Sequence, residues 1–326
     1  MKIRFKYLIG IFFLVNISLC IQAQEYALVI HGGAGVMSRD RMSKEAETSY
    51  RSILNKALML GDSLLKNGVS CTDVVVNVIN VMEDSPLFNA GKGAVFTNSR
   101  TNELDASIME GKTLNAGAVA GVTDIKNPIS AAYEVMENSE HVFLSGNGAS
   151  TFAKKQGIEI VPKKYFFTKN RYESLQKLLK REREREKKDN MGTVGCAVLD
   201  KYGNLCAGTS TGGMTNKKYG RIGDAPVIGA GTYANNKTCA ISCTGHGEYY
   251  IRLSFARDIS ALMEYKGLSV NEACKEEIRK LSELEGTGGV IAIDAKGNIA
   301  MEFNTSGMFR GYLKSTGEKE IAIFTE

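Results

Sequence analysis

The sequence has 326 residues, 43% of them hydrophobic and 24% charged, with 34 Gly, 4 Pro and no Trp. This composition excludes an intrinsically disordered or collagen-like chain, and the length allows one large domain or two small ones. The formal charge of +5 falls to +2 if a leader containing Lys2, Arg4 and Lys6 is removed, so the mature protein is nearly neutral and lacks the basic surface expected of a nucleic-acid-binding protein.

Residues 1–23 have the layout of a secretory signal peptide. A basic start is followed by an apolar run from Tyr7 to Leu19 and by a small residue, Ala23, at the expected cleavage site. The run is shorter than the ~20 residues that a membrane span needs. A lipoprotein attached through Cys20 is the alternative, but Leu19 is bulky where a small residue is wanted. We therefore expect an exported, periplasmic or secreted protein without a membrane anchor.

The histidines and cysteines do not form a metal-binding pattern. Only three histidines occur, and no two cysteines have C-x-x-C spacing. A disulfide is compatible with an exported protein but is not predicted. We expect most of the mature cysteines to be small buried apolar residues. These are Cys71, Cys196, Cys206, Cys239, Cys243 and Cys274.

Short β-branched runs predict buried strands, and apolar residues at helical spacing predict helices. The expected strands come in runs separated by runs of helices, and single strands do not alternate strictly with single helices. This order indicates layered α/β packing with a largely antiparallel sheet. The expected strands are 26–30, 105–109, 116–122, 193–199, 205–211, 227–233, 238–243, 289–293 and 299–303. The expected helices are 42–66, 72–82, 129–136, 148–156, 249–265 and 270–284.

Residues 171–190 (RYESLQKLLKREREREKKDN) carry eight basic and five acidic side chains, with almost no apolar face toward the end of the run. Such a run is typical of a solvated helix or a mobile charged linker rather than of a binding surface. We interpret it as a linker that ends just before Gly192.

Thr193 follows this run and opens a buried strand. A threonine at such a position is most often an ordinary strand residue. If the chain were cut before Thr193, however, a free α-amine would lie beside its hydroxyl. That amine, with a pKa near ~8, can serve as the general base for its own side chain, without a histidine. Thr193 is therefore a candidate N-terminal nucleophile.

Several motifs, in order along the chain, surround this candidate. They are HGGAG at 31–35, NAGKGAVFT at 89–97, TVG at 193–195, GTSTGGMTNK at 208–217, GRIGDAP at 220–226, GAGTYA at 229–234 and SCTG at 242–245. Together they resemble the plant-type asparaginase/isoaspartyl peptidase family of N-terminal-nucleophile (Ntn) hydrolases. The resemblance runs from about residue 26 to residue 310, outside the leader and the charged run.

The resemblance implies a four-layer αββα sandwich of the Ntn-hydrolase type that forms one structural domain. It also implies self-cleavage between Gly192 and Thr193 into an α chain of residues 24–192 and a β chain of residues 193–326, assembled as a homodimer of αβ units. The implied activity is hydrolysis of L-asparagine and of β-aspartyl (isoaspartyl) dipeptides, with release of L-aspartate.

The resemblance also implies roles for individual residues. Thr211 would hydrogen-bond the nucleophile across a hairpin, and Thr244 with Gly245 would form the oxyanion hole. The other implied site residues contact the substrate or lie beside it: Arg221 on the α-carboxylate, Asp224 on the α-ammonium, Gly247 where the backbone approaches closely, and Asn89 near the active site.

Two further points concern His246 and the loop before Gly93. His246 stands where the family has a small hydroxyl residue, so the preferred leaving group stays open. No cofactor is expected apart from a structural sodium ion, which backbone carbonyls of that loop would bind. The carbonyls belong to Met82, Glu83, Ser85, Phe88, Ala90 and Lys92, and a plain turn is the alternative. We expect His31 to be structural.

Two other functions stay open. A glycosylasparaginase, which cleaves the bond between a sugar and asparagine, shares the N-terminal threonine chemistry. The motifs at 31–35 and 211–214 favour the isoaspartyl peptidase branch instead. An exported, uncut binding protein without activity is the alternative from another class.

Overall fold

The structure is a computed structural model that describes residues 25–183 and 192–325, so the predicted leader lies outside the described residues. Its strands are β1 (Ala27–Gly35), β2 (Leu104–Glu110), β3 (Ala116–Val122), β4 (Phe143–Ser145), β5 (Val194–Leu199), β6 (Leu205–Thr211), β7 (Thr232–Ala234), β8 (Cys239–Gly245), β9 (Gly288–Asp294), β10 (Ile299–Phe303), β11 (Gly307–Lys314) and β12 (Lys319–Phe324). Its helices are α1 (Lys44–Lys66), α2 (Cys71–Glu83), α3 (Pro128–Asn138), α4 (Gly146–Lys155), α5 (Lys169–Arg183), α6 (Gly247–Leu253), α7 (Phe255–Lys266) and α8 (Val270–Glu283), with 3-10 turns η1 (Arg39–Arg41), η2 (Gly91–Gly93) and η3 (Lys163–Phe166).

The strands form two sheets. The larger sheet has the order β12-β11-β1-β5-β6-β2-β3-β4, and the smaller has the order β10-β9-β8-β7. Within these sheets the pairing is antiparallel, except between β3 and β4. The expectation of a largely antiparallel arrangement is therefore confirmed.

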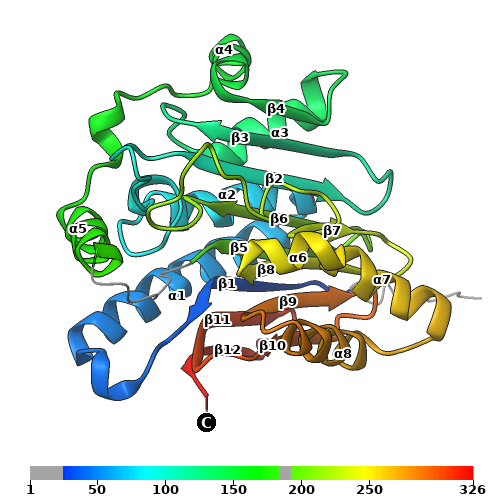
Figure 1. Ribbon diagram of the computed structural model, residues 1–326. Coiled ribbons are helices and arrows are strands. Elements are labelled where there is room, and N and C mark those ends of the chain that lie inside the picture. Colours follow the sequence, from blue (N-terminus) through cyan, green and yellow to red (C-terminus); the bar gives the residue numbers. More distant parts are fainter. Residues whose placement is uncertain (1–24, 184–191, 326) are drawn as a thin grey trace, which may run out of the picture.

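The two sheets pack face to face between two helical layers (Figure 1). Helices α1, α2 and α3 cover the outer face of the larger sheet, and α7 and α8 cover the smaller one. The predicted four-layer αββα sandwich is confirmed.

The alternation of side chains along each strand divides the core in two. On β1, Leu28 packs in the cluster under the helices, and Val29 packs between the sheets. On β5, Cys196 packs in the cluster under the helices and Ala197 packs between the sheets. Because side chains repeat every second residue, Thr193 shares the side of Ala197 and faces the space between the sheets.

Serine side chains begin three of the long helices. Ser43 accepts a hydrogen bond from the Ala46 amide at the start of α1, and Ser70 accepts one from Asp73 at the start of α2. At α8, Ser269 and Glu272 form a reciprocal capping box. Each cap satisfies an amide that the helix leaves without a partner, which explains why these helices begin where they do.

Three expected elements differ from the structure. Of residues 227–233 only the end is strand, because a turn closed by a 2.8 Å bond from the Val227 amide to the Asp224 carbonyl occupies the start. The helix expected at 249–265 is broken at Ser254, whose φ is +49°. Residues 171–183 belong to helix α5 and are not a mobile linker, and residues 184–190 lie outside the described residues. Strands β4, β11 and β12 were not predicted.

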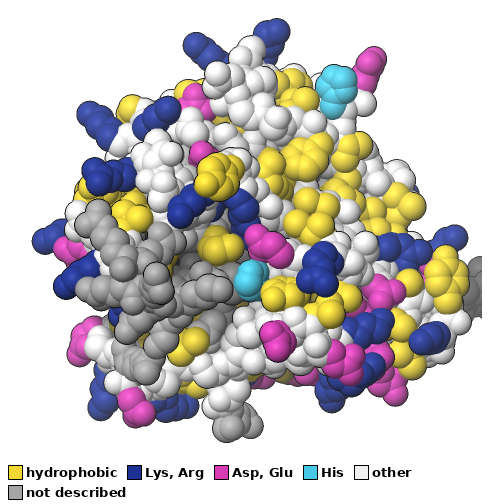
Figure 2. Space-filling view, viewed as in Figure 1, with side chains coloured by type: hydrophobic (Ala, Val, Ile, Leu, Met, Phe, Trp, Pro, Cys, Tyr) yellow, Lys and Arg dark blue, Asp and Glu magenta, His cyan; other side chains and the backbone are white. Residues whose placement is uncertain are grey.

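The described surface has mixed character. Lys and Arg side chains are interspersed with Asp and Glu side chains on the face seen in Figure 2. None of the described helices combines the length and the apolar character that crossing a membrane requires. All six cysteines of the described residues are free and buried, and the expectation that most of them are buried is confirmed.

We expect Gly117→Ala to destabilise the fold. A Cβ there would lie 2.1 Å from the Ala132 carbonyl oxygen and 2.5 Å from the Met136 nitrogen, both in the backbone of α3. The clash should cost about 1–3 kcal/mol of unfolding free energy. Gly148→Ala in α4 is the control, because no atom lies within 4 Å of its added Cβ. Thermal unfolding compares the two variants, and equal melting temperatures would contradict this account of how α3 packs on β3.

Candidate active site

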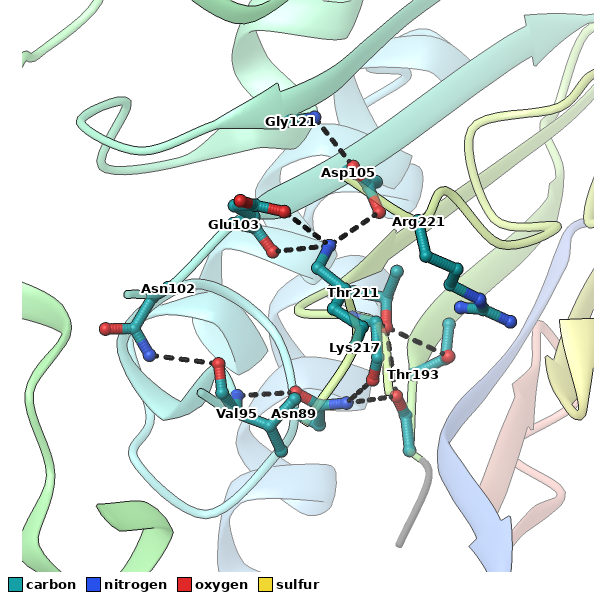
Figure 3. A network of polar contacts seen from close by, with 12 residues as sticks. Asn89, Val95, Asn102, Glu103, Asp105, Gly121, Thr193, Thr211, Lys217 and Arg221 are labelled. Carbon is teal, nitrogen blue, oxygen red and sulfur yellow. Dashed lines mark hydrogen bonds and ion pairs between the residues drawn. The ribbon is translucent and has the colours of Figure 1, made fainter. Parts of the chain in front are cut away.

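The β5–β6 hairpin places Thr193 beside Thr211. Val194 pairs with Ser210 in the antiparallel register, so the residues on either side of that pair, Thr193 and Thr211, are also neighbours. The Thr193 hydroxyl donates a 3.2 Å hydrogen bond to Thr211 Oγ1, and both residues are buried (Figure 3). The contact expected between them is present.

The carbonyl of Gly192 is held by two hydrogen bonds. Asn89 Nδ2 donates to this oxygen at 2.7 Å, and Thr211 Oγ1 donates to it at 3.0 Å. Asn89 is itself fixed, since its Nδ2 also donates to the Gly213 carbonyl and its Oδ1 accepts from the Val95 amide (Figure 3). The peptide bond before Thr193 therefore has its carbonyl oxygen between two donors and the Thr193 hydroxyl nearby.

A small pocket adjoins this peptide. Its volume is about 10 Å³, room for about one water molecule. The backbone of Gly192 is part of the wall, so the uncut chain occupies its own pocket. Six of the residues predicted for the site and its cleavage point line it, together with two further glycines and a methionine; the lining residues are Gly192, Thr193, Thr211, Gly213, Met214, Arg221, Gly223, Asp224 and Gly245.

A larger hollow, of about 330 Å³, lies elsewhere on the molecule. It is lined by Phe96, Phe167 and the basic side chains Arg100, Lys163 and Lys164, among others. None of the predicted catalytic residues lines it. The small pocket is therefore the candidate site because predicted hydroxyl and charged side chains converge on it, although the other hollow is larger.

Arg221 and Asp224 lie together in the small pocket. Arg221 donates to both carboxylate oxygens of Glu248, at 2.8 and 2.7 Å. Glu248 is a residue that sequence reasoning missed, since it belongs to none of the recognised motifs. Asp224 is buried, and burial raises its pKa to about 7 although the Arg221 guanidinium lowers it. The two side chains provide opposite charges in one pocket.

Gly247 and His246 flank this pair. A Cβ on Gly247 would lie 2.8 Å from Asp224 Oδ1 and 2.9 Å from Arg221 Nη2, so only glycine leaves room for both side chains. His246 Nε2 lies 3.4 Å from Glu248 Oε2, on the carboxylate that holds Arg221. The residue that departs from the family pattern thus contacts the partner of a predicted substrate-binding residue.

Thr244 and Gly245 end strand β8 on the smaller sheet. Thr244 is fully buried, and its Oγ1 accepts a hydrogen bond from the Ala34 amide at 3.3 Å. Because Thr244 Oγ1 is the acceptor in this bond, the Thr244 hydroxyl can still donate its own proton to another group. Gly245 lines the pocket, while Thr244 lies one residue behind the lining.

A chain of buried hydroxyls connects the two sheets behind the pocket. His31 Nε2 lies 2.9 Å from Ser242 Oγ, which lies 2.7 Å from Thr209 Oγ1, and Thr232 donates to Thr209 at 2.6 Å. Ser107 Oγ lies 2.8 Å from Thr232. Burial lowers the pKa of His31 to about 3, so the ring is neutral at physiological pH. Its surroundings agree with the structural role expected for it.

The loop after α2 curls tightly around its own carbonyls. A Cβ on Gly91 would lie 2.4 Å from the Glu83 carbonyl oxygen, and one on Gly93 would lie 1.9 Å from that of Phe88. The Met82 and Ala90 carbonyls accept hydrogen bonds from the amides of Ser85 and Gly93. Among the described residues, no three His, Cys, Asp or Glu side chains are grouped to hold a metal ion. The close approaches in this loop therefore involve backbone carbonyl oxygens.

Known proteins match the chain over most of its length. A family model described as asparaginase (Asparaginase_2) matches residues 24–323. The chain belongs to this asparaginase family. An isoaspartyl peptidase from Escherichia coli is 50% identical, over 87% of this chain and 92% of its own length. One from Salmonella typhimurium is 48% identical, over 87% and 94%. A human isoaspartyl peptidase/L-asparaginase is 39% identical, over 86% and 91%.

The match to the asparaginase family continues across the Gly192–Thr193 bond. It therefore includes both the loop that carries Asn89 and the strands that carry Thr193, Thr211 and Thr244. Gly213, Met214 and Gly223 line the pocket but were given no role from the sequence, although they stand inside the motifs at 208–217 and 220–226. Their position in those motifs was the signal from which a place in the pocket could have been predicted.

Proposed function

We propose that this member of the asparaginase family is a self-cleaving isoaspartyl peptidase/L-asparaginase, which hydrolyses β-aspartyl dipeptides and L-asparagine and releases L-aspartate. One observation carries the proposal. The Thr193 hydroxyl, two donors on the Gly192 carbonyl and a pair of opposite charges converge on one pocket. The names of the curated relatives agree with this activity.

Self-cleavage follows from the contacts of the uncut chain. The Thr193 oxygen attacks the Gly192 carbonyl carbon, and the charge that develops on the carbonyl oxygen is stabilised by Asn89 and Thr211. The bond to the Thr193 nitrogen then breaks as that nitrogen takes up the hydroxyl proton, which leaves an ester. Water hydrolyses the ester, giving a carboxylate on Gly192 and a free α-amine on Thr193.

Turnover reuses the same hydroxyl. The free amine accepts the Thr193 hydroxyl proton, and Thr211 orients the oxygen through its hydrogen bond. The oxygen attacks the side-chain carbonyl of the substrate, whose developing negative charge Thr244 and the Gly245 amide stabilise. The amine then protonates the leaving group, which is ammonia or the amino group of a peptide. Water finally releases aspartate from the acyl-enzyme.

Arg221 and Asp224 would select the aspartyl part of the substrate. A guanidinium binds an α-carboxylate through two parallel hydrogen bonds, and the Asp224 carboxylate accepts from the α-ammonium. Glu248 accepts bonds from Nε and Nη2 of Arg221, which fixes the guanidinium at the edge of the pocket. Gly247 supports the proposal by leaving space beside both side chains.

We propose further that the loop after α2 binds a sodium ion through the carbonyls of Met82, Glu83, Ser85, Phe88, Ala90 and Lys92. Hard oxygen donors suit such an ion. The close approach of the Glu83 and Phe88 carbonyls to Gly91 and Gly93 fits this donor set. The ion would stiffen the loop that carries Asn89 and would take no part in the reaction.

We also propose how the protein matures, where it is located and how it assembles. Removal of residues 1–23 would give an exported, periplasmic or secreted protein. Cleavage before Thr193 would give an α chain of residues 24–192 and a β chain of residues 193–326. A homodimer of αβ units would be the assembled form.

We expect Thr193→Ala to remain a single uncut chain without activity, because no hydroxyl is available to attack the Gly192 carbonyl. Thr193→Ser, which keeps a hydroxyl, should still cut itself. Denaturing electrophoresis and intact mass distinguish one full-length chain from two shorter chains. A wild-type preparation that is active but wholly uncut would contradict the mechanism, as would a cut alanine variant.

We expect β-aspartyl-leucine and L-asparagine to be substrates, and N-acetylglucosaminyl-asparagine to be a poor one. Release of aspartate, measured on each compound with the same purified protein, tests the choice between the two branches. Turnover of the sugar derivative alone would assign the protein to the glycosylasparaginases. No turnover of any of the three by the cut protein would contradict the proposed function.

The KM for L-asparagine should rise as the pH falls below about 7. Burial raises the pKa of Asp224 to about 7, so the carboxylate that accepts from the substrate ammonium is lost on protonation. A rise approaching tenfold per pH unit is expected well below that pKa. Asp224→Asn should have a high KM that no longer depends on pH in this range. A pH-independent KM in the wild-type protein would contradict the role of Asp224.

A further inference from the structure

A buried ion cluster lies beside the pocket and has no role in the chemistry above. The Lys217 side chain is 1% exposed, and its Nζ lies 3.5 Å from Glu103 Oε2 and 3.7 Å from Asp105 Oδ2 (Figure 3). The same Nζ donates to the Glu103 carbonyl at 3.3 Å. Burying an ammonium is costly unless carboxylates compensate it, so these three residues depend on one another.

Asp105 belongs to the same row of the sheet as the proposed nucleophile. It pairs directly with Thr211 across β2 and β6, and Thr211 contacts Thr193. Residues directly opposite each other in an antiparallel pair point to the same face. The side chains of Asp105, Thr211 and Thr193 therefore follow one another across three neighbouring chain segments on the side that faces the smaller sheet.

Asp105 has a partner for each of its carboxylate oxygens. Its Oδ1 accepts a 2.8 Å hydrogen bond from the Gly121 amide, and its Oδ2 faces Lys217 (Figure 3). Burial raises the pKa of Asp105, while Lys217, the Gly121 amide and Arg221 each lower it. Asp105 is thus held between β3, which carries Gly121, and the segment that ends at Lys217.

Lys217 ends the segment that leaves β6 at Thr211. This segment contributes Gly213 and Met214 to the pocket, and the Gly213 carbonyl accepts from Asn89. The Lys217 alkyl chain lies directly under Gly213, since a Cβ there would be 3.1 Å from Cδ and Nζ. The ion pair with Asp105 therefore ties the far end of the pocket segment back to the row of Thr211.

We propose that Asp105 is a positioning residue for the reaction, holding the 212–217 segment of the pocket wall through Lys217. The inference rests on the proposed function, because it assumes that this pocket binds the substrate. Asp105 touches neither the substrate nor the reacting atoms. Its effect should fall mainly on substrate binding and less on the chemical step.

The test compares Asp105→Asn with Glu103→Gln. Both substitutions remove one negative charge from Lys217, but the Asp105 side chain is fully buried and pairs with Thr211, whereas the Glu103 side chain is 25% exposed. We expect Asp105→Asn to raise the KM for L-asparagine by about tenfold or more with a smaller change in kcat, and Glu103→Gln to stay within about twofold of wild type. Equal KM values for the two cut variants would overturn the inference.

A triple variant, Glu103→Gln, Asp105→Asn and Lys217→Met, separates positioning from charge balance. It leaves no charge on any of the three residues, so its melting temperature should not fall below that of Asp105→Asn alone. Its KM should stay raised because the 212–217 segment still lacks its tie to Asp105. Recovery of a wild-type KM would reduce Asp105 to a counter-ion of Lys217 and overturn the inference. The wild-type protein is assayed in parallel, since an inactive wild type would refute the proposed function instead.

Discussion

The pairing of β5 with β6 is the constraint on which the rest of the site depends. Because Val194 lies opposite Ser210, Thr193 has to lie beside Thr211, and the peptide before it has to lie between Thr211 and Asn89. A slip of one residue would turn the Thr193 side chain to the helical side of the sheet. The buried apolar residues of both strands prevent such a slip, so ordinary core packing fixes the position of the Thr193 hydroxyl.

The space between the sheets is apolar at one end and polar toward the pocket. Ala197, Leu205 and Ala207 pack in the apolar part. Nearer the pocket, the hydroxyl chain from His31 to Ser107 and the charges around Asp105 and Asp224 replace apolar contacts. Buried polar groups are tolerated when partners satisfy them, and networks of this kind hold their members in one arrangement. Rigidity at the site is consistent with a reaction that depends on the alignment of small hydroxyl groups.

The central strands and most of the residues that line the pocket could be predicted from the sequence. The central strands are short apolar runs bounded by glycine and turn residues, so their existence and the β5–β6 hairpin were clear. Thr193, Thr211, Arg221, Asp224 and Gly245 stand in motifs with little freedom of position, and the structure brings them to one pocket. Their roles were suggested by resemblance rather than by spacing.

The remainder depends on contacts between distant segments. Glu248 meets Arg221 only after α6 folds back over the pocket, and Asp105 meets Lys217 across 112 residues. Nothing local in either stretch signals such a contact. The first part of the charged run at 171–190 forms helix α5, as the solvated-helix interpretation expected, and not the linker that we preferred; its buried Leu175 is easily overlooked among so many charged residues.

The order of strands in the larger sheet has a consequence for a protein cut before Thr193. From one edge to the other, β12 and β11 come from the second fragment, β1 from the first, β5 and β6 from the second, and β2, β3 and β4 from the first. The strands of the two pieces thus alternate in blocks across the larger sheet, whereas the smaller sheet comes wholly from the second piece. Because the larger sheet needs strands from both pieces, we expect folding to precede scission and the backbone hydrogen bonds between the blocks to hold the pieces together afterwards.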